Sequence, residues 1–126
     1  MKKKRHSHGC AVSQYNGSPT VFVAGGIGEN GIRLDTVEVL NIQGRKEWII
    51  LNSSLPHPLF SLQAVTSHSS KYFIYVIGGY GNGGNRNEIY GLNRTLGWEL
   101  VGNLANSRHG HVSLNVRKNE IPECGN

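Results

Sequence analysis

Two glycine doublets, each closing a short apolar run, constrain this chain more than any other feature. Gly25-Gly26 ends the first run and Gly78-Gly79 ends the second. Other residues recur with a spacing near 50 or twice that value: Glu38 with Glu88, Trp48 with Trp98, and Arg5-His6-Ser7-His8 with Arg108-His109-Gly110-His111. A fixed period of this length is typical of a chain that repeats one supersecondary unit.

The apolar runs are short, are bounded by Gly, Asn, Ser and Pro, and keep no helical spacing, which predicts an all-β fold. The strands expected in the first unit are 8–12, 20–24, 35–42 and 47–51, and those in the second unit are 61–66, 71–77, 87–92 and 98–101. Residues 110–116 are expected to form a further first strand, followed by a polar tail at 117–126.

The second strand of each unit is apolar on both faces, so a neighbouring layer is expected on each side of it. Four-stranded antiparallel sheets that stack at this period are the blades of a β-propeller. We therefore expect one domain over 1–126, with blade one at 8–51, blade two at 61–101 and the first strand of a third blade within 108–116. A ring needs about four to eight blades, so either the rest of a longer chain or self-association is expected to close it.

The order of these residues resembles the kelch-repeat family. The matching residues are Arg5, His8, Ala11-Val12, Gly25-Gly26, Val37-Glu38 and Trp48 in unit one, Ala64-Val65, Gly78-Gly79, Glu88-Ile89-Tyr90 and Trp98 in unit two, and Arg108 and His111 at the third restart. The pattern departs from the family at Leu40, which stands at a tyrosine position, and at Pro58 and Ser61, which stand at the arginine and histidine positions of unit two.

The resemblance implies a non-enzymatic protein-interaction scaffold, such as a substrate adaptor of a ubiquitin ligase or an actin-associated protein. In that family, the loops at one rim hold a partner protein or peptide. The candidates for partner binding are the rim arginines and asparagines Arg5, Arg33, Arg86, Arg108, Asn30 and Asn85. An alternative is a fragment of a propeller enzyme, such as a galactose-oxidase-like copper oxidase, with its catalytic residues outside this chain.

The repeated residues have structural interpretations as well. The glycine doublets are expected at positions of positive φ and of close backbone approach. Trp48 and Trp98 are expected to pack one blade on the next. A carboxylate such as Glu38 or Glu88 in an apolar setting needs a partner, for which Arg5, Arg108 and backbone N–H groups are the candidates.

Charge and composition exclude several functional classes. The formal net charge is +5, but Lys2, Lys3, Lys4 and Arg5 supply four of these charges, and a body near +1 indicates no nucleic-acid-binding face. No apolar run is long enough to cross a membrane, and no apolar segment follows the basic start as in a signal peptide. A cytoplasmic location is expected, with secretion open if the chain is a fragment. Cys10 is expected to be a small buried hydrophobic residue, and two cysteines (Cys10 and Cys124) make no disulfide framework.

Three further patterns point toward a specific kind of site, but none is complete. Residues 26–31 and 79–84 both fit G-x-G-x-x-G, but a strand rather than a helix is expected after the first, so neither predicts a dinucleotide site. The pairs His6/His8 and His109/His111 lack a neighbouring Cys, Asp or Glu, which argues against a metal site. No serine lies in a nucleophile elbow. We expect no enzyme activity, no cofactor and no metal.

Overall fold

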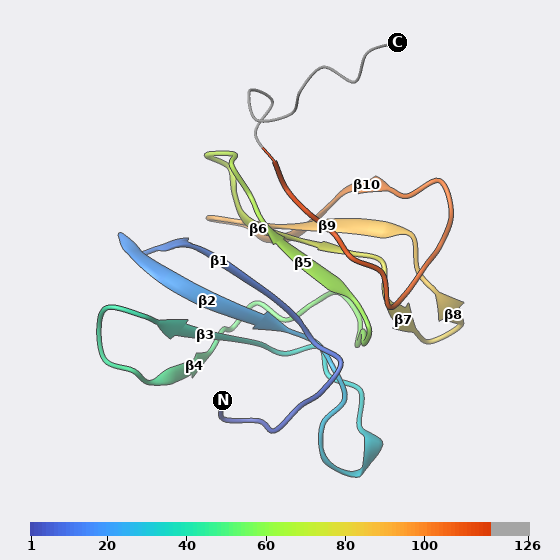
Figure 1. The fold of residues 1–126 in the computed structure, drawn as a ribbon, viewed down its shortest axis with the longest axis horizontal. Helices are drawn as coiled ribbons and strands as arrows, with labels where there is room; N and C mark the ends of the chain where they lie inside the picture. The colour runs from blue at the N-terminus through green and yellow to red at the C-terminus, as the bar shows by residue number, and fades with distance from the viewer. Residues whose placement is uncertain (117–126) are drawn as a thin grey trace.

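The computed structural model describes residues 1–116, which form two four-stranded antiparallel sheets (Figure 1). The N-terminal sheet has the order β1-β2-β3-β4, with β1 (Gly9–Tyr15), β2 (Ser18–Ala24), β3 (Val37–Asn41) and β4 (Trp48–Ile50). The C-terminal sheet has the order β10-β9-β6-β5, with β5 (Gln63–Thr66), β6 (Tyr72–Ile77), β9 (Glu88–Asn93) and β10 (Gly97–Asn103). The all-β prediction is confirmed, and each unit is an antiparallel meander.

Two short elements lie in the connections between the second and third strands. A single 3-10 turn, η1 (Glu29–Gly31), lies between β2 and β3, and the two-residue strands β7 (Tyr80–Gly81) and β8 (Gly84–Asn85) pair between β6 and β9. Residues 1–116 contain no α-helix and no helix with the length and apolarity of a membrane span. No helix opens at Gly31, so residues 26–31 lack the helix N-terminus that a dinucleotide site requires.

Eight of the nine predicted strands are present, and their ends differ from the predicted ones by at most three residues. The ninth, residues 110–116, is not a strand. It runs next to β5 in an extended course, and the Asn115 side chain donates a hydrogen bond to the Thr66 carbonyl. Within residues 1–116 its backbone forms no ladder with β5 or with any other strand. The predicted polar tail at 117–126 lies outside the described residues.

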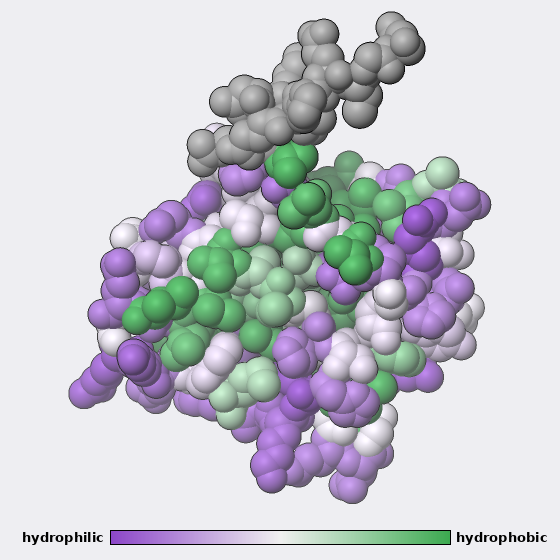
Figure 2. Space-filling model, viewed as in Figure 1, coloured by the Kyte–Doolittle hydropathy of each residue, from purple (hydrophilic) through white to green (hydrophobic). Residues whose placement is uncertain are grey.

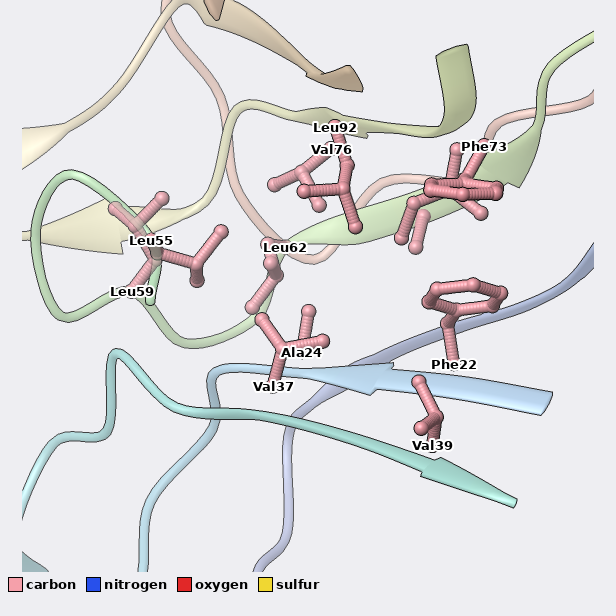
Figure 3. Packing of buried hydrophobic residues seen from close by; sticks show 12 residues of the cluster. Phe22, Ala24, Val37, Val39, Leu55, Leu59, Leu62, Phe73, Val76 and Leu92 are labelled. Carbon is pink, nitrogen blue, oxygen red and sulfur yellow. The ribbon is translucent and has the colours of Figure 1, made fainter. Parts of the chain in front are cut away.

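The core lies between the two sheets. Figure 3 shows Phe22, Val37 and Val39 of the N-terminal sheet pointing toward Val76 and Leu92 of the C-terminal sheet. The connection after β4 adds Leu55, Leu59 and Leu62 to this layer, and all three are almost fully buried. We call the side of the N-terminal sheet that enters this core its inner face and the opposite side its outer face. Alternation along each strand assigns every residue to one of the two.

Strand pairing changes the alignment between the two units. Val23 and Val76 lie at equivalent distances before their doublets, yet Val23 pairs with Glu38 whereas Val76 pairs with Tyr90. Tyr90, not Glu88, is therefore the structural counterpart of Glu38, and the alignment of Glu38 with Glu88 is two residues out of register. The error arises in the hairpin between the third and fourth strands: Leu40 faces Trp48 and Leu92 faces Trp98, so the second hairpin is two residues shorter.

The first strands are also shifted. Cys10 pairs with Val23 and Ala64 pairs with Val76, so the counterpart of Ala64 is Cys10 rather than Ala11. The segments that lead into these strands follow the same shift. Arg5-His6-Ser7-His8 corresponds to Leu59-Phe60-Ser61-Leu62, and Ser7 and Ser61 share a positive φ of 55° and 50°. The arginine and histidine positions of unit two are thus held by leucines, not by Pro58 and Ser61.

The glycine doublets have the predicted positive φ, at 65° and 98° for Gly25 and Gly26 and at 58° and 102° for Gly78 and Gly79. They also join consecutive units. A Cβ atom on Gly25 would lie 2.4 Å from the carbonyl oxygen of Leu59, in the segment that enters the next unit. A Cβ atom on Gly78 would lie 2.6 Å from the carbonyl oxygen of Arg108 in the same way. Only a residue without a side chain permits this approach.

Cys10 is exposed, and the prediction that it is buried was wrong. It lies on the outer face of β1, opposite Val23, and within residues 1–116 no second sheet covers this face. Val12 is on the same face and is 46% exposed. Figure 2 shows apolar side chains gathered over β1, β2 and the segment that leads to residue 116. Apolar surface is thus left open on the N-terminal sheet and along residues 110–116.

Candidate functional site

Side chains from both units meet at one rim of the molecule, where the connections between second and third strands lie beside the segments that enter the first strands. We call this group the rim cluster. Its members are Arg33, Phe60, Tyr80, Asn82, Asn85 and His109. Arg33 comes from the β2–β3 connection and Phe60 from the segment before β5. Tyr80, Asn82 and Asn85 belong to the β7–β8 hairpin, and His109 belongs to the segment after β10.

The guanidinium of Arg33 lies over two aromatic rings. Its Cζ atom is 5.3 Å from the centroid of Phe60 and 5.7 Å from that of Tyr80, both within cation–π range. Its Nη1 donates a hydrogen bond of 3.2 Å to the Oδ1 of Asn82. Three contacts therefore orient an exposed arginine, which removes part of the entropic cost of binding a partner.

The aromatic rings are themselves positioned by the backbone. Phe60 and Tyr80 exchange two backbone hydrogen bonds of 3.1 and 2.8 Å, and their rings lie 5.3 Å apart. His109 meets the Tyr80 ring edge to face at 5.5 Å, and its Nδ1 lies 2.7 Å from the Oδ1 of Asn85. The result is an aromatic platform with a guanidinium above it and an imidazole at its side.

The members of the rim cluster carry cationic, amide and aromatic groups but no carboxylate. Arg33, Asn82, Asn85 and His109 are exposed, whereas Phe60 and Tyr80 are half-buried. A planar guanidinium whose remaining N–H groups face solvent can bind a carboxylate through two parallel hydrogen bonds. The arrangement can therefore bind an acidic side chain or a chain terminus and stack on an aromatic or peptide group beside it.

The predicted partner-binding residues lie in different environments. Arg33 and Asn85 lie in the rim cluster, and Asn30 is exposed in η1 of the same connection as Arg33. Arg108 is exposed, with its backbone bonded to Gly79 and Arg86. Arg5 has no exposed side-chain surface, so it leaves the set of surface candidates.

Arg5 instead stabilises the scaffold. Its Nη2 lies 2.6 Å from Oε1 of Glu38, and neither side chain is exposed. Its Nη1 donates to the carbonyl oxygens of Gly25 and Thr36, each at 2.9 Å. Burial raises the pKa of the Glu38 carboxyl, but the backbone N–H groups of Lys2 and Lys3 and the Arg5 guanidinium outweigh it, and the net pKa lies below the ordinary value. The predicted pairing of Glu38 with Arg5 and backbone N–H groups is confirmed.

The cation that pairs with Glu88 was not among those predicted, although a backbone N–H group, that of Asn87, does donate to its Oε2 at 3.1 Å as expected. Its Oε1 lies 2.6 Å from Nη2 of Arg86, two residues earlier, and this pair is partly exposed. Burial raises the pKa of the Glu88 carboxyl, and its own backbone N–H and Arg86 outweigh it and lower the net pKa. Arg86 also lies 3.2 Å from Nε2 of His57, which is 2.9 Å from the Tyr90 hydroxyl. Arg86 is thus engaged within the C-terminal unit.

The two tryptophans behave differently. Trp98 packs against the core between the sheets, and its Nε1 donates to the Ser53 carbonyl at 3.3 Å. It therefore joins one unit to the other, as predicted. Trp48 has the equivalent place on the outer face of the N-terminal sheet, opposite Leu40, and is half-buried there.

Phe60, Tyr80, Asn82 and His109 were not predicted as site residues. One signal for Phe60 and His109 was available, because His6, Phe60 and His109 occupy the same position in successive units. The aromatic at Phe60 becomes visible only after the one-residue shift of the first strand. Tyr80 and Asn82 occupy variable positions of the G-x-G-x-x-G match at 79–84, which does not indicate a rim site, and only the folded hairpin brings them to Arg33.

Within residues 1–116, no carboxylate or thiol joins either histidine pair to make a group of three potential metal ligands. No protein-family model and no curated protein sequence matches this chain.

Proposed function

We propose that this chain is a section of a kelch-type β-propeller, that each of its sheets is one blade, and that it acts as a non-enzymatic protein-binding module through the rim cluster. The observation that carries the binding proposal is the Arg33 guanidinium held over Phe60 and Tyr80. Arginine and aromatic side chains in one exposed group are the composition of an interface hot spot.

Three features support the assignment of blades. Each unit is a four-stranded antiparallel meander, and the two stack face to face through the strands that were predicted to be apolar on both sides. Each glycine doublet contacts the segment that enters the following unit. The Arg108 carbonyl accepts a hydrogen bond from Gly79 N–H at 2.9 Å, as the Leu59 carbonyl does from Gly26 N–H at 2.7 Å. The same step is thus repeated twice along the chain.

The partner that best fits the rim cluster is an acidic peptide segment. The cluster offers the Arg33 guanidinium and the His109 imidazole without a competing carboxylate among its members. Amide groups of Asn82 and Asn85 flank them and can bond to a peptide backbone. Membership of a ubiquitin-ligase adaptor or an actin-associated protein follows from the family resemblance and is part of this proposal.

The test is a titration of the full chain with a glutamate-rich peptide and with its glutamine-substituted counterpart, followed by backbone amide shifts. We expect the acidic peptide alone to shift the amides of 25–36 and 78–87. Arg33→Ala is expected to weaken binding about tenfold or more. Arg45→Ala is the matched control, because Arg45 is an exposed arginine in the β3–β4 turn at the opposite end of the strands. Equal binding of both peptides, or equal losses in both variants, would reject the proposal.

A further inference from the structure

We propose that copies of this chain assemble head to tail, with the N-terminal sheet of one copy docking on the C-terminal sheet of another in the place now held by residues 108–116. The proposal stands on strand register and on a repeated motif, and it does not depend on what the rim cluster binds.

The first observation is that the outer face of the N-terminal sheet matches a face that is already buried. On the C-terminal sheet the equivalent face packs on the N-terminal sheet and includes Ala64 and Val76, both buried. Their counterparts are Cys10 and Val23. Cys10 is exposed although Ala64 is only 8% exposed. Val23 is itself only 3% exposed, so it is the β1 part of the outer face, at Cys10 and Val12, that repeats a buried face without a covering layer.

The second observation is a motif that occurs twice. Arg5-His6-Ser7-His8 leads into β1, and Arg108-His109-Gly110-His111 lies against the C-terminal sheet. The two segments share the same backbone turn, with φ of 55° at Ser7 and 60° at Gly110. The site on the C-terminal sheet that receives Arg108 to His111 therefore fits the start of a second copy in both sequence and conformation.

The third observation concerns how residues 108–116 are held. Two backbone bonds to Arg108 and one from Gly110 N–H to the Ser61 carbonyl fix the start of the segment. Beyond it the Asn115 amide bonds to Thr66, while Val112 is 90% exposed and Leu114 is 81% exposed. In Figure 2 the apolar atoms along this segment face solvent. A second copy would bring a complete sheet to this site. By the spacing of the repeated motif, Val112 and Leu114 correspond to Gly9 and Ala11, whose side of β1 is covered by the C-terminal sheet of the same copy.

The exchange would also preserve the rim. His6 has the same backbone position as His109, so the partner copy would place an imidazole where His109 now contacts Tyr80 and Asn85. Successive copies would then carry the rim cluster along one continuous edge.

The experiment measures the mass of the full chain by sedimentation velocity across the micromolar range, together with the rate at which a maleimide labels Cys10. We expect a concentration-dependent increase in mass and, in parallel, slower labelling of Cys10, because the outer face is buried on association. A chain that stays monomeric at every concentration, or a labelling rate that does not follow the mass, would overturn the proposal.

Two substitutions test the surfaces. Cys10→Glu introduces a charge at a site that is exposed in the single chain and buried in the assembly, and it is expected to weaken association about tenfold or more. Ile49→Glu is the matched control, because Ile49 is 56% exposed on the inner side of the same sheet, opposite Val39, and it is expected to have no effect on association. Val12→Glu on the same face as Cys10 should repeat the first result if Cys10→Glu fails to fold.

A third substitution tests the exchange. A Cβ atom at Gly110 meets nothing within 4 Å, so Gly110→Val strains only the backbone turn that holds the resident segment. Association is expected to tighten about tenfold, because a β-branched residue disfavours positive φ and releases the site. Weaker association in Gly110→Val would show that residues 108–116 support the interface instead of occupying it, and the proposal would fail.

Discussion

The two sheets fill equivalent buried positions with side chains of different chemistry. At one register position the N-terminal sheet carries Glu38, fully buried and paired with Arg5. At the equivalent position the C-terminal sheet carries Tyr90, whose hydroxyl lies 2.9 Å from His57, and the counterpart of Arg5 is Leu59. One unit buries an ion pair where the other buries a leucine and a neutral hydroxyl.

The comparison shows that the repeat conserves position and face more strictly than charge. An arginine and a glutamate must be exchanged together, because removing one partner of a buried pair leaves an uncompensated charge. The C-terminal unit instead has an ion pair between Arg86 and Glu88. Glu88 lies two residues before Tyr90, and the pair is partly exposed. The buried site in the first unit requires both charges together, whereas the partly exposed site at the edge of the second unit does not.

The largest expected effect is the loss of Arg5. Arg5→Leu copies Leu59 into the N-terminal unit and should destabilise the chain by about 3–5 kcal/mol, because Glu38 is then buried without its cation. Denaturant unfolding measures the loss. The double variant Arg5→Leu/Glu38→Tyr copies both residues of the C-terminal unit and should recover most of it. If the double variant is no more stable than Arg5→Leu, the two positions are not interchangeable and the comparison fails.

Alanine at the first glycine of each doublet should give a smaller and unequal effect. Positive φ alone costs about 1–3 kcal/mol, and both alanines meet a carbonyl oxygen. In Gly25→Ala that oxygen belongs to Leu59, which is buried in the core, whereas in Gly78→Ala it belongs to Arg108 in an exposed segment that can shift. Unfolding free energies should therefore fall more in Gly25→Ala. Gly17→Ala, at a positive φ with no atom nearby, measures the strain alone.

The partly exposed pair should matter little. Arg86→Leu is expected to cost less than about 1 kcal/mol, since Arg86 and Glu88 remain accessible to water when separated. Added salt should reduce this cost but leave that of Arg5→Leu nearly unchanged. Unfolding free energies of both variants at low and high salt distinguish the buried pair of the first unit from the partly exposed pair of the second. Similar salt sensitivity in both would contradict the difference in burial.

The smallest expected effect is a pH dependence from His8. Burial, reinforced by Arg5 and His6, lowers the pKa of the His8 imidazole below its ordinary value of 6.5. The unfolded chain therefore takes up a proton that the folded chain resists, and stability should decline as the pH falls through 6.5 and below. His8→Leu copies Leu62 and should flatten this part of the profile. Burial also lowers the pKa of His111, so a residual slope of the same sign is expected in the variant.

The sequence was sufficient to predict the strands and the layers, because glycine doublets and doubly apolar runs report directly on sheet burial. It misplaced Glu88 and Ala64 because pairing register depends on hairpin length, which the conserved Glu and Trp spacing concealed. A register shift of two residues keeps each side chain on the same face of the sheet, so the apolar pattern could not reveal that Glu88 was misaligned.

The rim cluster was predicted only in part for a related reason. Arg33 and Asn85 were found because they lie in loops that recur with the repeat. Tyr80 and Asn82 depend on how the β7–β8 hairpin folds back, and no periodic signal marks loop conformation. Arg5 was misassigned because the sequence does not distinguish an arginine in a solvated loop before a strand from one in a buried ion pair.

The approach of Leu59 to Gly25 has a consequence for synthesis of the chain. The end of β2 is enclosed by a carbonyl that lies 34 residues further along, so this edge stays open on the ribosome until the next unit has begun to emerge. Each unit is therefore completed by its successor, and vectorial translation would close these contacts in order from the amino end.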